Sequence, residues 1–60
     1  MATRERVDGK TPNGGDYSEI FYLDKDHNEV EPEEAAEFIL WECKKDGTII
    51  STTRGLMRDG

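Results

Sequence analysis

The residues best suited to binding a metal ion are three oxygen-bearing side chains at alternate positions, Asp24, Asp26 and Asn28. Alternate carboxylate and amide oxygens suit a hard cation such as Ca²⁺. A calcium-binding loop of this kind also needs a glycine at its sixth position and a glutamate at its twelfth, and the chain has neither there, counted from Asp24. The segment Asp24–Asn28 is therefore predicted to be a turn, in which Asp and Asn side chains bond to their own backbone. Weak divalent-ion binding at this turn is the alternative.

Zinc binding or nucleophilic catalysis would have to use one histidine, His27, and one cysteine, Cys43. A structural zinc site needs four such ligands, so we expect no metal site. The two side chains lie on different predicted elements, and no third group is placed to orient them. We therefore expect no catalytic residues, no cofactor and a protein that is not an enzyme. A single cysteine also rules out an intramolecular disulfide.

The clearest start and stop signals flank a segment from Pro32 to about Lys45. Proline suits the first helical turn, where its amide nitrogen would have no partner within the helix. Glutamates follow the proline, lysines lie at the other end, and Gly47 comes just after them, which matches the helix dipole and a glycine stop. These signals predict an α-helix over residues 32–45.

On this predicted helix the apolar residues extend beyond one core-facing stripe. Ile39 and Cys43 would face a sheet, whereas Phe38 and Trp41 would lie beside each other and away from it. Either a curled sheet or the N-terminal segment covers the two aromatic rings, or the rings form an interface with another protein or a second copy of the chain. The predicted partner-binding residues are Phe38, Trp41, Glu34 and Glu37.

Three further segments are predicted strands. Tyr17–Leu23 is rich in aromatic and β-branched side chains, and its alternation puts Ile20 and Tyr22 on the same face. After the turn, Glu29–Glu31 returns as the second strand of a β-hairpin. The run Thr48–Thr53 is β-branched almost throughout and is predicted to be the third strand.

Together these elements predict an α+β fold: a small three-stranded antiparallel sheet in the order β-β-α-β, with one helix packed on one face. Residues 1–16 contain Pro, Asn and consecutive Gly around positions 11–15, and they are predicted to be a flexible N-terminal arm. Residues 17–60 are predicted to form a single α+β mini-domain. A chain of 60 residues is too short for a second domain.

Charge is the strongest compositional feature, because 14 acidic and 8 basic side chains give a net charge of −6. Seven of the acids and one lysine lie between Asp24 and Glu37. Binding to a polyanion depends on Lys and Arg, so direct nucleic-acid binding is not expected. No apolar run is long enough to span a membrane, and the N-terminus lacks the apolar stretch of a signal peptide. We therefore expect a soluble, cytoplasmic protein that does not contact a membrane.

These observations predict a small acidic, non-catalytic protein-interaction or regulatory module. Its acidic surface would steer association, and aromatic side chains would hold the partner, which could present the basic face of a nucleic-acid-binding protein. The alternative is a structural homo-oligomer, with a homodimer as its simplest form, in which the same aromatics pair across a two-fold axis. Divalent-ion binding at Asp24–Asn28 is the third possibility.

Overall fold

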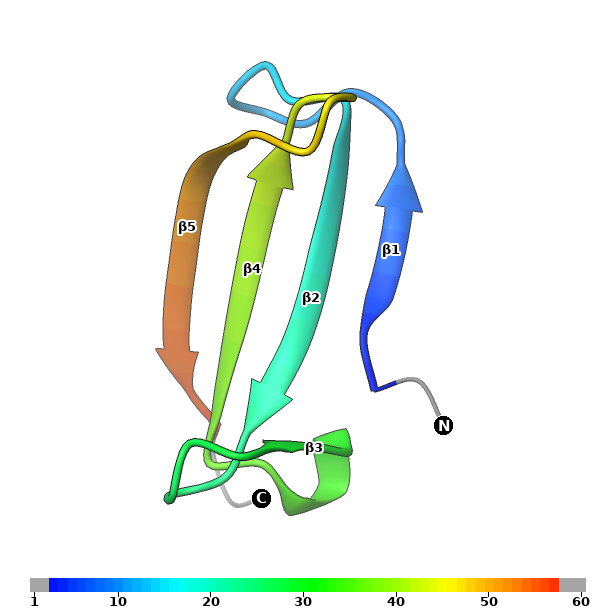
Figure 1. Cartoon of the computed structure of the whole chain (residues 1–60). Helices are drawn as coiled ribbons and strands as arrows, with labels where there is room; N and C mark the ends of the chain where they lie inside the picture. The colour runs from blue at the N-terminus through cyan, green and yellow to red at the C-terminus, as the bar shows by residue number, and fades with distance from the viewer. Residues whose placement is uncertain (1–2, 58–60) are drawn as a thin grey trace.

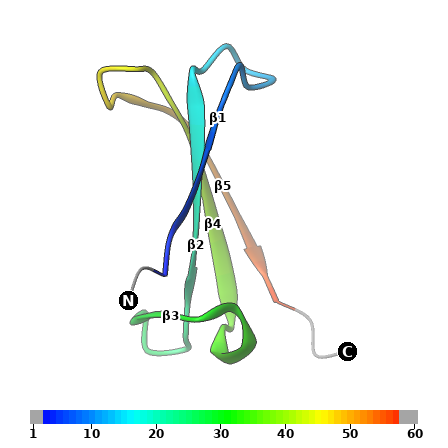
Figure 2. The ribbon, with the colours of Figure 1, turned by 90° about the vertical axis from the view of Figure 1, so that its right-hand side faces the viewer.

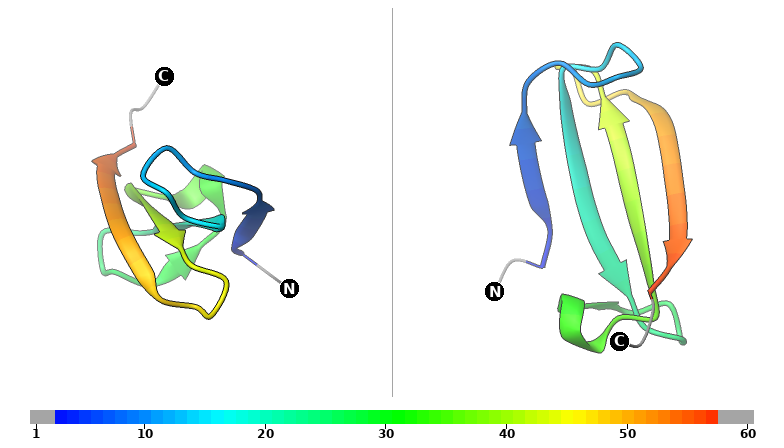
Figure 3. Two further views of the ribbon diagram at one scale, coloured as in Figure 1. Left: turned by 90° about the horizontal axis from the view of Figure 1, so that it is seen from above. Right: turned by 180° about the vertical axis from the view of Figure 1, so that it is seen from behind.

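The computed structural model describes residues 3–57, in which antiparallel strands form one sheet (Figure 1). The sheet runs in the order β1-β2-β4-β5, and β3 pairs with β2 beyond the end of β1. Views from above and from behind show β1 and β5 at opposite edges (Figure 3). The elements are β1 (Glu5–Asp8), β2 (Tyr17–Leu23), β3 (Glu29–Val30), the 3-10 turn η1 (Pro32–Glu34), β4 (Glu37–Cys43) and β5 (Ile49–Leu56).

Two central strands, β2 and β4, form the middle of the sheet. They pair along their full length, from Tyr17 opposite Cys43 to Leu23 opposite Glu37. The predicted strand Tyr17–Leu23 is confirmed with the same bounds, and the predicted hairpin with Glu29 and Val30 is confirmed as the pairing of β2 with β3. Aromatic and β-branched side chains favour this paired, half-buried surface.

The predicted helix is wrong, and with it the α+β fold class. The described residues contain no α-helix: Pro32–Glu34 form a single 3-10 turn, Ala35 is already extended, and Glu37–Cys43 form β4. A short apolar run fits a buried strand as well as a helix, and here β2 and β5 pair with it on both sides. Gly47, at φ 97°, closes the β4–β5 hairpin and does not stop a helix.

The predicted N-terminal arm is also wrong for the described residues, because Glu5–Asp8 form β1 and pair in register with β2. Residues 1–2 of that arm lie outside the described part of the chain. The connection from β1 to β2 is folded back on itself. Thr11 N–H donates to the Gly15 carbonyl, and Gly14 N–H donates to the Thr11 carbonyl. The turn-forming residues therefore make a defined loop between two paired strands.

The strands lie in one twisted layer, which is seen nearly edge-on in Figure 2. Most domains bury a sheet face against a second layer, but no second layer is present within residues 3–57. Alternate residues point to opposite faces. We call the side that carries Tyr17, Phe21, Ile39 and Trp41 the arginine face, because Arg4 and Arg6 lie over it. The other side, with Ile20, Tyr22, Phe38 and Leu40, is the open face.

Candidate interaction surface

The open face is a compact block of large apolar side chains. Ile20 lies directly opposite Leu40, and Tyr22 lies directly opposite Phe38, so the four residues form two adjacent cross-strand pairs. All four side chains are only half-buried. None of them is charged, and on the β5 side the next residues on this face are uncharged too, as at Thr53. The block is therefore apolar and partly accessible to solvent.

A glycine shapes the β5 side of the open face. Gly55 lies opposite Phe38, and the Phe38 ring lies across the space that a side chain at position 55 would fill. A β-carbon added to Gly55 would be 2.7 Å from Cζ of Phe38 and closer still to Cε1. The absence of a side chain at Gly55 thus lets the Phe38 ring approach β5 closely.

The loop between β1 and β2 closes one end of the open face. Glu42, which is only 6% exposed, accepts hydrogen bonds from the backbone N–H of Asn13 (3.0 Å) and from the Asn13 side-chain amide. Hydrogen bonding by the Thr11 hydroxyl and by Asn13 lowers the pKa of Glu42 from its ordinary value of 4.5. The carboxylate therefore fastens the loop to the sheet as an ionised group.

The arginine face differs because charged side chains lie over its aromatic rings. The guanidinium of Arg4 is 4.2 Å from the centroid of the Phe21 ring and 5.2 Å from that of Trp41. The Phe21 and Trp41 rings meet edge to face, with their centroids 4.8 Å apart. Arg6 lies in the same way over Tyr17, at 3.9 Å. Phe21 is only 5% exposed, so this face supplies part of its own cover.

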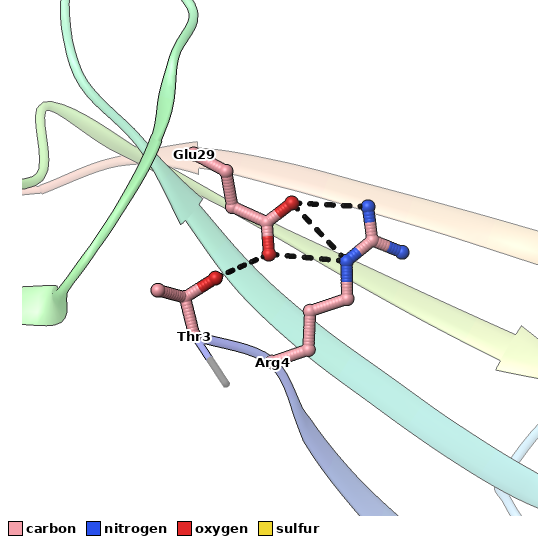
Figure 4. Close-up of polar contacts among 3 residues, drawn as sticks. All are labelled: Thr3, Arg4 and Glu29. Atoms are coloured by element: carbon pink, nitrogen blue, oxygen red, sulfur yellow. Dashed lines mark hydrogen bonds and ion pairs between the residues drawn. The ribbon is translucent and has the colours of Figure 1, made fainter. Parts of the chain in front are cut away.

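An ion pair holds Arg4 in that position (Figure 4). Its guanidinium donates to both carboxylate oxygens of Glu29 at 3.1–3.2 Å, and the Thr3 hydroxyl donates to the same carboxylate. The hydrogen bonds from Arg4 lower the pKa of Glu29. Since Arg4 immediately precedes β1 and Glu29 begins β3, the contact joins two strands that follow one another along the same edge of β2.

The four residues that the sequence assigned to partner binding are not brought together. Phe38 is on the open face, whereas Trp41 is on the arginine face, because residues three apart in a strand point to opposite sides. Glu34 is exposed on η1. Glu37 begins β4 and accepts a hydrogen bond from Arg54 at 2.9 Å. A helix would have placed Phe38 and Trp41 side by side, and the strand separates them.

The turn after β2 lies in the most acidic part of the molecule, residues 24–34, which we call the acidic end. It holds six acids and one lysine. Asp24 closes the turn: its carboxylate accepts from the backbone N–H groups of Asp26 and Asn28 at 2.9 Å, and this bonding lowers its pKa. His27 takes the left-handed conformation, at φ 66°. Within residues 3–57 no three metal-ligating side chains are grouped.

The described chain opens no pocket and has no helix long and apolar enough to cross a membrane. Sequence reasoning missed Ile20, Tyr22 and Leu40 as surface residues. Two of them could have been found, because the alternation in Tyr17–Leu23 already placed Ile20 and Tyr22 on one face.

Comparison with models of known protein families, with curated proteins and with solved structures finds no match to this chain.

Proposed function

We propose that this chain is a non-catalytic protein-interaction module whose open face binds a partner protein. The observation that carries the proposal is the open face itself: Ile20, Tyr22, Phe38 and Leu40 are apolar, uncharged and half-buried, with no described segment over them. Burying such a patch stabilises a complex by about 25 cal/mol for each Å² of apolar surface removed from water. A partner would therefore supply the second layer that the sheet lacks.

The charge distribution favours the open face over the arginine face as the binding surface. Cores of protein interfaces are depleted in charge and enriched in aromatic residues. On the open face the outer strand partners of Tyr22 and Phe38 are the uncharged Val30 and Gly55, and the charge nearest the block in the sheet is Glu5, opposite Ile20. On the arginine face, Arg4 already lies over the rings of Phe21 and Trp41, so a partner would have to displace a guanidinium that is paired with Glu29.

The acidic end suggests the chemistry of the partner. It directly follows Tyr22 and Leu23 along the chain, so the aromatic pair of the open face adjoins six acids. A partner with an apolar patch beside basic residues would fit both features, and its approach would be steered by charge. The basic face of a nucleic-acid-binding protein has this character. Steering by exposed charges weakens as salt screens them.

Two matched variants test the choice of face. Leu40→Thr removes apolar surface from the open face, while Ile39→Thr makes a comparable change one residue earlier on the same strand and on the opposite face. Both place threonine, a β-branched residue suited to a strand, at the substituted position. Each variant and the wild-type chain would be used to capture partners from a lysate of the source cells. A protein recovered in this way would then be purified and its affinity measured by calorimetry at low and high salt.

The proposal expects Leu40→Thr to weaken binding of the purified partner by about tenfold, equivalent to about 1.4 kcal/mol, and Ile39→Thr to leave it nearly unchanged. It also expects affinity to fall as salt rises. Equal binding by both threonine variants, or loss of binding with Ile39→Thr alone, would contradict the assignment of the open face. Trp41→Ala tests the original prediction for Trp41 in the same assay, and here it should act only through stability.

A further inference from the structure

The outer edge of β5 has little of the usual protection of an edge strand. β5 pairs with β4 on one side, and no strand among residues 3–57 pairs with its other side. Over eight residues β5 has no proline and one charged side chain, Arg54. Ile50 is 39% exposed and Leu56 is 83% exposed. Natural edge strands are normally short, charged, bulged or covered, because their free N–H and C=O groups otherwise recruit another strand.

The opposite edge of the same sheet shows the contrast. There β1 and β3 are short, at four and two residues, and most of their side chains are charged. The Arg4–Glu29 ion pair bridges the gap between them. One edge of the sheet is thus short and charged, as protected edges of natural sheets are. The other is long and nearly uncharged, with one bulge at Ile50, near its start.

We propose that the β5 edge pairs with the β5 edge of a second copy of this chain, antiparallel about a two-fold axis that passes beside Thr53. The two sheets then become one continuous sheet. A two-fold axis perpendicular to the sheet leaves the same face of both copies on the same side. In an antiparallel pair, such an axis passes between one residue and the same residue of the second copy. The free β5 edge carries this proposal, which therefore does not depend on the open face as a binding surface.

The sequence of β5 selects Thr53 as the residue at the axis. With Thr53 opposite its own copy, Ile50 of each chain lies opposite Leu56 of the other, which brings together two exposed apolar residues at each end. An axis at Arg54 would put two guanidinium groups directly opposite each other, which is unfavourable in a cross-strand pair. An axis at Thr52 would place Arg54 opposite Ile50 and leave Leu56 outside the paired strand. The axis at Thr53 avoids both faults.

Charge also favours an antiparallel pair despite the net charge of −6 on each chain. The acidic end and the Lys44–Thr48 turn lie at opposite ends of the sheet (Figure 1). Antiparallel pairing therefore puts the two acidic ends at opposite ends of the dimer, separated by about 20 Å along the strands, which exceeds a Debye length of about 8 Å. It also brings Lys45 of one copy toward the acidic end of the other. The Arg54–Glu37 ion pair leaves the middle of the edge close to neutral.

Charge-swap variants at the axis test both the dimer and its register. Thr53→Lys and Thr53→Glu each place like charges opposite one another in the proposed dimer, and Thr53 is exposed in the single chain. Either variant alone should raise the dimer dissociation constant by about tenfold or more, while an equimolar mixture should form the heterodimer. Analytical ultracentrifugation and native mass spectrometry of the full chain give the masses. Circular dichroism checks that each variant is folded.

Two controls separate this edge from the rest of the surface. Val7→Lys adds a charge to the opposite edge, and Leu40→Thr alters the open face; both variants should remain dimeric. A wild-type chain that is monomeric at its highest soluble concentration would overturn the proposal. So would dimers of Thr53→Lys as tight as wild type, or no heterodimer in the mixture. Loss of the dimer with Leu40→Thr would mean that copies meet through the open face, which also overturns pairing at β5.

Discussion

The contact between Phe38 and Gly55 can be tested by replacing Gly55 with alanine. The added β-carbon would be 2.7 Å from Cζ of Phe38, well inside an ordinary carbon–carbon contact, so the ring has to move away from β5. Overcrowding of this kind costs about 1–3 kcal/mol. The ring is half-exposed and can swing outward, which places the cost toward the low end of that range.

An opposing effect has to be subtracted. Alanine is favoured over glycine inside a strand by about 0.5–1 kcal/mol, because glycine loses more backbone freedom on folding. We therefore expect Gly55→Ala to destabilise the wild-type chain by about 0.5 kcal/mol, the excess of overcrowding over this gain. In a Phe38→Ala background the ring is gone, and the same substitution should stabilise the fold by about 0.5–1 kcal/mol. The sign of the effect thus depends on Phe38.

Urea unfolding followed by the fluorescence of Trp41 measures the free energy of unfolding of all four proteins in this double-mutant cycle. Trp41 is the single tryptophan and lies on the opposite face from Phe38, so its signal reports unfolding without being altered by the substitutions. The protein concentration is held fixed, because association would shift apparent stability. An equal gain from alanine in both backgrounds would refute the close approach of the ring to Gly55, since coupling would then be absent.

Three other predictions follow from the polar contacts. The pKa of Glu42 is lower in the folded chain than the ordinary 4.5. The stabilisation that the ionised Glu42 gives the fold is therefore present above about pH 4.5 and is lost as pH falls through the folded pKa. The melting temperature should fall in acid, and it should fall less steeply in Glu42→Gln. Asn13→Ala removes an amide donor to Glu42 and should speed hydrogen exchange in residues 11–15, whereas unchanged exchange would mean that the loop holds without it. Arg4→Ala removes an exposed ion pair and a cation–π contact; urea unfolding should show a loss of about 1 kcal/mol, and Trp41 emission should shift to the red.

Local sequence signals predict the strands and turns that depend on neighbouring residues. Tyr17–Leu23 and the hairpin with Glu29 and Val30 are confirmed, since alternation and Asp/Asn turn chemistry act over a few residues. The predicted third strand, Thr48–Thr53, corresponds to β5, which begins one residue later and extends to Leu56. In these segments the local preference and the final pairing agree.

The failed predictions concern segments whose structure is decided by distant residues. Glu37–Cys43 has helix signals on both sides, but its backbone is paired with β2 and β5. Nothing within the segment itself reveals those partners. Glu5–Asp8 has one substantial apolar residue, Val7, and so resembles a disordered arm. The contacts of the neighbouring Arg4 with Phe21 and Glu29 come from residues far along the chain. The predicted pairing of Phe38 with Trp41 depended on the same helix, and in the strand the two side chains lie on opposite faces.

The two-residue strand β3 has a consequence for how the chain reaches its structure. β1–β2 and β4–β5 are hairpins of neighbouring segments, but the central pairing of β2 with β4 must close residues 24–36. Loop closure costs entropy that increases with the length of free chain, and non-local pairing slows folding. Pairing of β3 with Tyr22 and Leu23 takes up part of that length. The smallest strand of the sheet is therefore expected to affect the folding rate, because it shortens the free chain that must close when β2 pairs with β4.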